Sequence, residues 1–135
     1  MRPYALQAGE GRTYRYDIKF TVKAGELQPG RGATFLEYTT RKGEEPPMHT
    51  HPTEDELFYV LKGNLTFRCG DETFEVSEGG FVYLPQGISH GYTIRSDEEV
   101  HLIVITFSIS ATAGQGWSGF VADIEQQGEL INKSE

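Results

Sequence analysis

The 135-residue chain is poor in several features that would assign it to particular protein classes. Cys69 is its single cysteine, so no disulfide can form within the chain, as is typical of proteins of the reducing cytoplasm. We expect Cys69 to be a small buried side chain without a functional role. The start of the chain lacks the apolar stretch of a secretion signal, and no run of about eighteen apolar residues is present. These absences predict a cytoplasmic protein without a membrane segment.

Positive charge is also scarce. The twelve Lys and Arg residues are scattered singly among twenty Asp and Glu residues, and the formal net charge is −8. A nucleic-acid-binding surface needs clustered basic side chains that can follow a phosphate backbone. We therefore expect no nucleic-acid partner, and the lack of a recognisable DNA-binding segment argues against a one-chain transcriptional regulator.

Long segments of helical periodicity are missing, whereas glycine and β-branched or aromatic residues are abundant. Sixteen glycines separate short apolar or alternating runs, a pattern typical of many short strands joined by turns. The length corresponds to one domain, residues 1–135. Because so many strand edges are usually protected by closing the sheet, we predict an all-β barrel or sandwich. The expected strands are YRYDIKFTV, ATFLEYTT, ELFYVL, LTFRCG, TFEVS, FVYLP, GYTIR and VHLIVITF.

The two ends of the chain add elements to this core. Residues 12–23 predict N-terminal strands with open edges, through which two copies could pair, so we expect a homodimer. In residues 114–130, apolar side chains recur at spacings of three and four, as on one side of a short helix. The alternative for this segment is a hydrophobic flap that closes one end of the core. The apolar residues concerned are Trp117, Phe120, Val121 and Ile124.

The stretch PPMHTHPTEDELFYVLKG places ionisable side chains where a core strand begins. His49 and His51 are two residues apart, so on a strand both would project from the same face, roughly 7 Å apart along the backbone. Pro52 would end that strand, and Glu56 would open the next one. His90, after the turn PQG, would start a returning strand. Three imidazoles and one carboxylate suit a divalent transition metal.

Nine positions in two groups resemble the paired motifs of the cupin superfamily, here of its small single-domain members. The resemblance covers about residues 32–107. It implies a double-stranded β-helix, or jelly-roll barrel, with metal ligands at the three histidines and the glutamate. Small cupins commonly pair through N-terminal strands, so it also supports a homodimer. The first motif reads Gly43, five residues, His49, one residue, His51, four residues, Glu56, six residues, Gly63. The second reads Gly79, five residues, Pro85, one residue, Gly87, two residues, His90.

One position departs from the family pattern, because Ile94 stands where cupins often have an asparagine. That asparagine is not a metal ligand, so the departure concerns local hydrogen bonding and contacts with a substrate. Glu54 and Asp55 could compete for the metal, but they fall in the preceding turn, whereas Glu56 has the motif position. His101 lies outside both motifs, and we expect it to be a surface or hydrogen-bonded histidine.

Strand parity predicts the surroundings of the metal. Phe58 and Val60 would share the face of Glu56, and Tyr92 would share the face of His90, which gives an apolar and aromatic substrate pocket. Such a lining favours a neutral or aromatic small molecule over a sugar phosphate, which would need Lys or Arg beside it. The alternative is that these side chains simply pack the barrel.

The resemblance leaves several functions open. Quercetinase-like dioxygenases among the cupins imply an enzyme that binds a small aromatic or enolic molecule at the metal, with Glu56 alternating between metal ligand and general base. A metal-dependent isomerase or cyclase would use the same ligands, and a non-catalytic cupin module would bind a small molecule without turnover. We expect a dioxygenase-type enzyme with one divalent Fe, Mn, Ni, Cu or Zn ion per chain.

Overall fold

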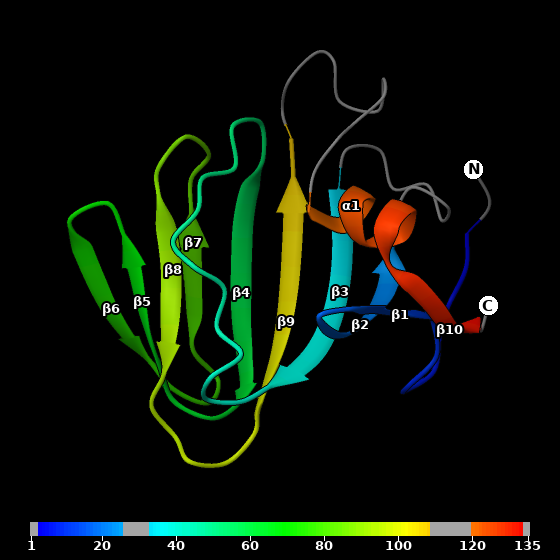
Figure 1. Ribbon diagram of the computed structural model, residues 1–135, viewed down its shortest axis with the longest axis horizontal. Coiled ribbons are helices and arrows are strands. Elements are labelled where there is room, and N and C mark those ends of the chain that lie inside the picture. The colour runs from blue at the N-terminus through cyan, green and yellow to red at the C-terminus, as the bar shows by residue number, and fades with distance from the viewer. Residues whose placement is uncertain (1–2, 26–32, 109–119, 134–135) are drawn as a thin grey trace.

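The protein is an all-β jelly-roll with one short helix, seen in a computed structural model that describes residues 3–25, 33–108 and 120–133. A seven-stranded antiparallel sheet, in the order β10-β1-β2-β3-β9-β4-β7, packs against a three-stranded sheet, β6-β5-β8 (Figure 1). The predicted fold class is confirmed. The elements are β1 (Arg12–Tyr16), β2 (Ile18–Ala24), β3 (Ala33–Thr40), β4 (Asp55–Lys62), β5 (Leu65–Cys69), β6 (Glu72–Val76), β7 (Phe81–Leu84), β8 (His90–Ile94), β9 (Val100–Phe107), α1 (Phe120–Gln127) and β10 (Glu129–Lys133).

Strand alternation builds the core, as the sequence pattern predicts. Along β9, every second side chain from Val100 is buried while its neighbours are partly exposed. β9 lies between β3 and β4 and pairs with both over nearly its full length. The two sheets meet through aromatic contacts such as that of Phe58 in β4 with Phe67 in β5, whose ring centroids are 5.1 Å apart. Cys69 is buried at the end of β5, as expected.

The N-terminal segment forms a hairpin of two strands, β1 and β2. Asp17 has a φ of 67°, in the left-handed region that turns favour, and it separates β1 from β2. β1 pairs with β2 on one side and with β10 on the other. The prediction of an open edge on the N-terminal strands is therefore wrong. The sequence did not predict β10, which pairs with the outer side of β1. Among the described residues, the end strands of the large sheet are β10 and β7.

Helix α1 occupies part of the segment that was expected to be a short helix or a flap. Val121 and Ile124 are fully buried, and the ring of Phe120 packs edge-to-face on Phe20 at a centroid distance of 5.3 Å. Trp117 lies outside the described residues. The helix thus brings the C-terminal part of the chain against β1 and β2 (Figure 1). It has eight residues, and no helix in the described part is long and apolar enough to cross a membrane.

Candidate metal centre

Four side chains from separate parts of the chain converge at one end of the barrel. One ligand atom from each of His49, His51, Glu56 and His90 can be chosen so that all four atoms lie within 4.8 Å of one another. Glu56 is the second residue of β4, and His90 is the first residue of β8. The structure therefore brings together all four residues that the motif spacing predicted as metal ligands.

The two histidines of the first motif do not lie on a regular strand, contrary to the sequence prediction. His49 makes an isolated antiparallel bridge with His90, in which each backbone N–H donates to the other residue's carbonyl, at 2.9 and 2.8 Å. Residues directly opposite in such a pair project to the same side. The backbone thus holds these two ligands side by side although 41–54 is an irregular connection (Figure 1).

His51 is positioned by the turn of the second motif. The backbone N–H of Gly87 donates to the His51 carbonyl at 2.9 Å. Gly87 has a φ of 80°, a conformation that glycine adopts without a steric penalty. The glycine of this turn therefore directs a backbone donor at the segment that carries His49 and His51.

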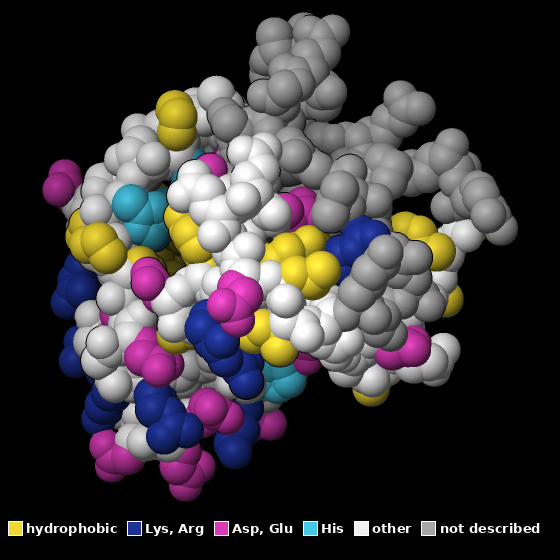
Figure 2. Space-filling view, turned by 45° about the vertical axis from the view of Figure 1, so that its right-hand side comes forward, with side chains coloured by type: hydrophobic (Ala, Val, Ile, Leu, Met, Phe, Trp, Pro, Cys, Tyr) yellow, Lys and Arg dark blue, Asp and Glu magenta, His cyan; other side chains and the backbone are white. Residues whose placement is uncertain are grey.

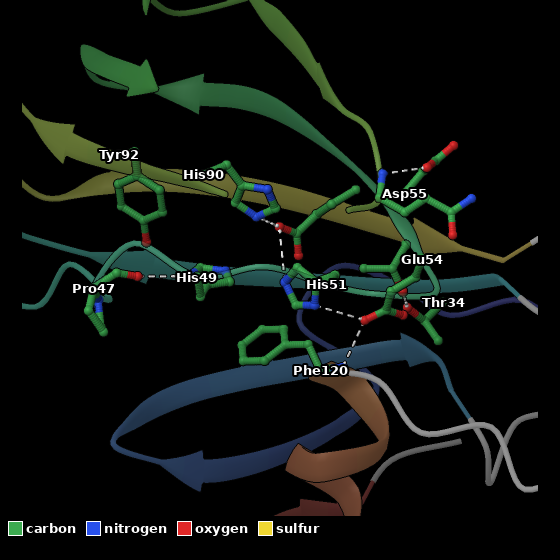
Figure 3. A network of polar contacts seen from close by, with 12 residues as sticks. Thr34, Pro47, His49, His51, Glu54, Asp55, His90, Tyr92 and Phe120 are labelled. Carbon is green, nitrogen blue, oxygen red and sulfur yellow. Dashed lines mark hydrogen bonds and ion pairs between the residues drawn. The ribbon is translucent and has the colours of Figure 1, made fainter. Parts of the chain in front are cut away.

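Hydrogen bonds determine which ring nitrogen two of the histidines can offer. His49 donates from Nδ1 to the carbonyl of Pro47 at 2.8 Å, and His51 directs Nδ1 at Glu54 Oε1 at 3.2 Å (Figure 3). A neutral imidazole that donates from Nδ1 keeps its lone pair on Nε2. In the neutral form, both rings therefore carry their available lone pair on Nε2.

Glu56 lies between the imidazoles. Its Oε1 is 3.0 Å from His90 Nε2 and 3.7 Å from His51 Nε2, and its side chain is 3% exposed. The ring centroids of the three histidines are 4.7 to 5.3 Å apart. A buried carboxylate surrounded by three imidazoles is a donor set that suits a divalent transition metal.

One buried atom supports this fit directly. His51 Nε2 is buried and has no hydrogen-bond partner among the described residues, although buried polar atoms are rarely left unsatisfied. Because Nδ1 of the same ring already serves as the donor, Nε2 is an acceptor that faces Glu56, which is itself an acceptor. A cation between the two groups would satisfy both, so the residues present fit a metal.

The histidines differ in their electrostatic surroundings. Burial lowers the pKa of His49, and the neighbouring imidazoles of His90 and His51 lower it further, which favours the neutral ring that metal binding needs. Burial also acts to lower the pKa of His51. The hydrogen bond to Glu54 and the charges of nearby carboxylates outweigh burial, however, and raise this pKa overall.

The two competing carboxylates have other partners. Asp55 accepts hydrogen bonds from the Tyr83 hydroxyl and from the backbone N–H of Gln86, the latter at 2.8 Å, and so fastens the turn between β7 and β8. Glu54 is 1% exposed and contacts His51 from the side of Nδ1 (Figure 3). Neither belongs to the group of converging ligand atoms, in agreement with the choice of Glu56.

His101 lies away from this centre. Its Nε2 is hydrogen-bonded to the Glu37 carboxylate, and about a third of its side chain is exposed. This agrees with the expectation of a hydrogen-bonded surface histidine.

A cavity of about 240 Å³ opens beside the four ligands. Phe58 and Tyr92 line it, as strand parity predicted, whereas Val60 is fully buried in the core and is not among the lining residues. Figure 2 shows histidine side chains next to hydrophobic ones on this side of the molecule. None of the described residues that line the cavity is a Lys or Arg.

Several walls of the cavity were not anticipated from the sequence. They come from the β1–β2 hairpin, β3 and α1, which lie far from both motifs along the chain. No local pattern marks such residues, because their exposure to the cavity follows from packing between distant elements. The additional apolar and aromatic lining residues are Tyr16, Ile18, Phe20, Tyr38 and Phe120.

A pair of tyrosines forms the polar part of this lining. The hydroxyls of Tyr38 and Tyr92 are 3.0 Å apart and buried. Burial raises the pKa of Tyr92 to about 12 and that of Tyr38 well above its usual value, and the Glu56 carboxylate adds to both shifts. Both hydroxyls therefore stay protonated at neutral pH, and the pair holds one more proton than its mutual hydrogen bond uses.

Comparisons with known proteins agree with this geometry. Quercetin 2,3-dioxygenase of Bacillus subtilis is 30% identical over 70% of this chain and 28% of that protein. Oxidoreductase macE of Penicillium terrestre is 29% identical over 97% of this chain and 60% of that protein. The chain thus spans less than two thirds of the length of these curated relatives.

Solved structures support the fold. A predicted oxalate decarboxylase of Thermotoga maritima superposes with a TM-score of 0.67 at 13% identity, over 79% of this chain and all of that chain. A protein of Photorhabdus luminescens gives a TM-score of 0.62 at 20% identity, over 81% of this chain and 90% of that chain. The family model of the cupin domain matches residues 36–106. That match covers more than half of the sequence and both ligand motifs, and the protein belongs to the cupin family.

Proposed function

We propose that the protein is a metal-dependent oxidoreductase, specifically a dioxygenase that acts on a small aromatic or enolic molecule. The supporting observation is that His49, His51, Glu56 and His90 line the same cavity as a set of aromatic side chains. A substrate in this cavity would touch the ligand cluster and the apolar walls together. Large, well-formed apolar cavities with a few convergent polar groups are the usual sites of small-molecule chemistry.

The metal, when bound by these four residues, would supply a positive charge that lowers the pKa of a substrate hydroxyl. Glu56 is the carboxylate of this centre and can accept the proton that leaves that hydroxyl, while the substrate oxygen keeps the electron pair. Glu56 is 3% exposed, so its carboxylate has little contact with bulk water. Glu56 thus combines the roles of ligand and general base.

The walls of the cavity support this substrate class. Phe58, Phe20 and Phe120 offer flat apolar surfaces, and the Tyr38–Tyr92 pair can donate a hydrogen bond to a substrate oxygen. A phosphate or a polycarboxylate would meet no basic side chain among the described lining residues, and the cavity also contains Glu44 and Glu45. A flat molecule that is neutral before deprotonation fits these conditions best.

The relatives lend further support. Those at 27–30% identity include one named as a quercetin 2,3-dioxygenase and one named as a probable oxidoreductase. Because this chain spans 28% and 59% of their respective lengths, their reactions inform the proposal and do not decide it.

Oxygen uptake tests the proposal. The protein is loaded in turn with iron, manganese, nickel, copper and zinc and mixed with a panel of flavonols, catechols and diketones, with the wild type and Glu56→Gln compared. Glutamine keeps an oxygen that can face the metal but is a far weaker base. We therefore expect the variant to retain metal and lose turnover. A different result would be a wild type that binds such compounds without consuming oxygen or altering them, whichever of these metals is present. That result would contradict the proposal and favour a non-catalytic binding role.

A further inference from the structure

Glu54 is a buried carboxylate that the proposed reaction does not use. It immediately precedes β4, and its side chain is 1% exposed. Burying an ionisable group is costly unless its oxygens accept hydrogen bonds. The partners of Glu54 therefore indicate what its burial achieves.

One oxygen of Glu54 has two partners, one close to it in the sequence and one 66 residues away. Oε1 lies 3.2 Å from Nδ1 of His51 and accepts the backbone N–H of Phe120 at 3.0 Å (Figure 3). The second oxygen, Oε2, is buried without a hydrogen-bond partner among the described residues. A single atom thus joins a predicted metal ligand to the first residue of α1.

The contact with His51 acts on the metal centre. It holds the proton on Nδ1, so that the lone pair of Nε2 faces Glu56. Partners of this kind orient the ligand ring, and their loss typically weakens metal affinity by about 10- to 100-fold.

The contact with Phe120 acts on the cavity wall. The first N–H groups of a helix have no partner within the helix, and Glu54 satisfies one of them at α1. The Phe120 ring lines the cavity and packs on Phe20, so the position of this backbone amide determines where the wall stands.

We propose that Glu54 is a positioning residue that orients His51 toward the metal and, through the same oxygen, holds Phe120 at the wall of the substrate cavity. The role rests on the proposed function to the extent that a metal and an apolar ligand occupy this site. Metal affinity and the position of the apolar wall would then both depend on Glu54.

Two binding measurements and a spectrum test the role without relying on turnover. Metal affinity is measured by competition of Co²⁺ and Zn²⁺ with a chromophoric chelator. The visible absorption of the Co²⁺ form reports the arrangement of its ligands. Binding of the neutral aromatic probe N-phenyl-1-naphthylamine to the metal-loaded protein reports the apolar wall.

The variants separate the two contacts. We expect Glu54→Ala to weaken Co²⁺ and Zn²⁺ binding by about 10- to 100-fold, to alter the Co²⁺ spectrum and to weaken probe binding. Glu54→Gln keeps an acceptor oxygen and should recover most of both affinities. Phe120→Ala keeps the backbone N–H and should weaken only the probe. Glu75→Ala, a control carboxylate that accepts the Thr66 hydroxyl in the small sheet, should change neither affinity.

Metal affinity and a Co²⁺ spectrum in Glu54→Ala equal to those of the wild type would overturn the role. If that variant does not fold, the decision rests on Glu54→Gln, which keeps an acceptor oxygen. The role requires the Co²⁺ spectrum of Glu54→Gln to match that of the wild type, and a different spectrum would overturn it. If the wild type binds metal but turns over no substrate, the proposed reaction is contradicted and the proposed role of Glu54 is not. A wild type that binds no metal would overturn both.

Discussion

The four ligands form two pairs that are held in different ways. Glu56 and His90 lie at the starts of regular strands and are 3% and 2% exposed. His49 and His51 lie in an irregular connection and are partly exposed, and backbone hydrogen bonds from other segments hold them. Strand register therefore positions the first pair, whereas the second pair depends on contacts that individual substitutions can remove.

The largest expected effect comes from removing the second pair altogether. The double variant His49→Ala, His51→Ala should lose its metal, because two of the three imidazoles disappear. Elemental analysis of the purified protein measures this loss. His101→Ala provides the control, since that histidine lies outside the ligand cluster and its variant should keep a full complement of metal. Unchanged metal content in the double variant would show that the ligand assignment is wrong.

A smaller effect is expected when the support of the second pair is loosened without touching a ligand. Gly87→Ala places a side chain at a φ of 80°, which should cost about 1–2 kcal/mol of folding stability and disturb the hydrogen bond to the His51 carbonyl. We expect about tenfold weaker Zn²⁺ binding.

Gly79→Ala is a matched control for this variant. Gly79 has a φ of 81°, and, as at Gly87, an added Cβ would meet no atom within 4 Å. Its N–H donates to Val60, which is not a ligand. The two variants should lose similar stability in denaturant unfolding, and only Gly87→Ala should lose Zn²⁺ affinity. Equal Zn²⁺ affinities would mean that the turn does not position His51.

The buried surroundings of the first pair can be probed at alkaline pH. Tyr92 has a pKa raised to about 12 by burial, whereas an unfolded tyrosine ionises near pH 10. The folded state therefore binds the proton more tightly, and the stability that this provides is present below pH 10 and lost between about pH 10 and 12. The free energy of unfolding should fall by about 1.4 kcal/mol per pH unit for this tyrosine.

Tyr92→Phe should make that decline shallower, because one titrating hydroxyl is removed while Tyr38 remains. Unfolding of the metal-free protein in denaturant between pH 9 and 12 measures both slopes. Identical slopes for the wild type and the variant would contradict the burial of a protonated Tyr92.

The smallest effect on the site is expected from self-association. We still predict a homodimer, now through β10 or β7, the end strands of the large sheet in the described part of the chain, since β1 and β2 are paired on both sides. These edges carry no metal ligand, so dilution should change the mass in light scattering and leave metal content unchanged. Exposed apolar side chains lie on both end strands, Phe81 and Tyr83 on β7 and Leu130 and Ile131 on β10, so either strand could form the contact. A single 15.1 kDa species at micromolar concentration would contradict the prediction.

The sequence predicted the setting of one ligand pair, Glu56 and His90, better than that of the other, His49 and His51. Glu56 and His90 could be predicted because each stands at a motif position and at the start of an expected strand, and both signals are local in the sequence. The irregular path around His49 was missed, because its geometry depends on a bridge to His90, 41 positions along the printed chain. β10 was missed for a similar reason, since it is stabilised by pairing with β1 at the other end of the sequence.

The sequence by itself determined the class of fold, because turn residues and strand periodicity are local properties of the chain. It also identified the candidate ligands, because the spacing of its two motifs resembles that of the cupins. Tertiary structure alone decided which nitrogen His51 presents, which carboxylate supports it and which aromatic side chains face the cavity. Glu54 is only three residues from His51, yet its second partner, Phe120, is 66 residues away. Contacts of this kind follow from the packing of whole elements, and no spacing along the chain records them.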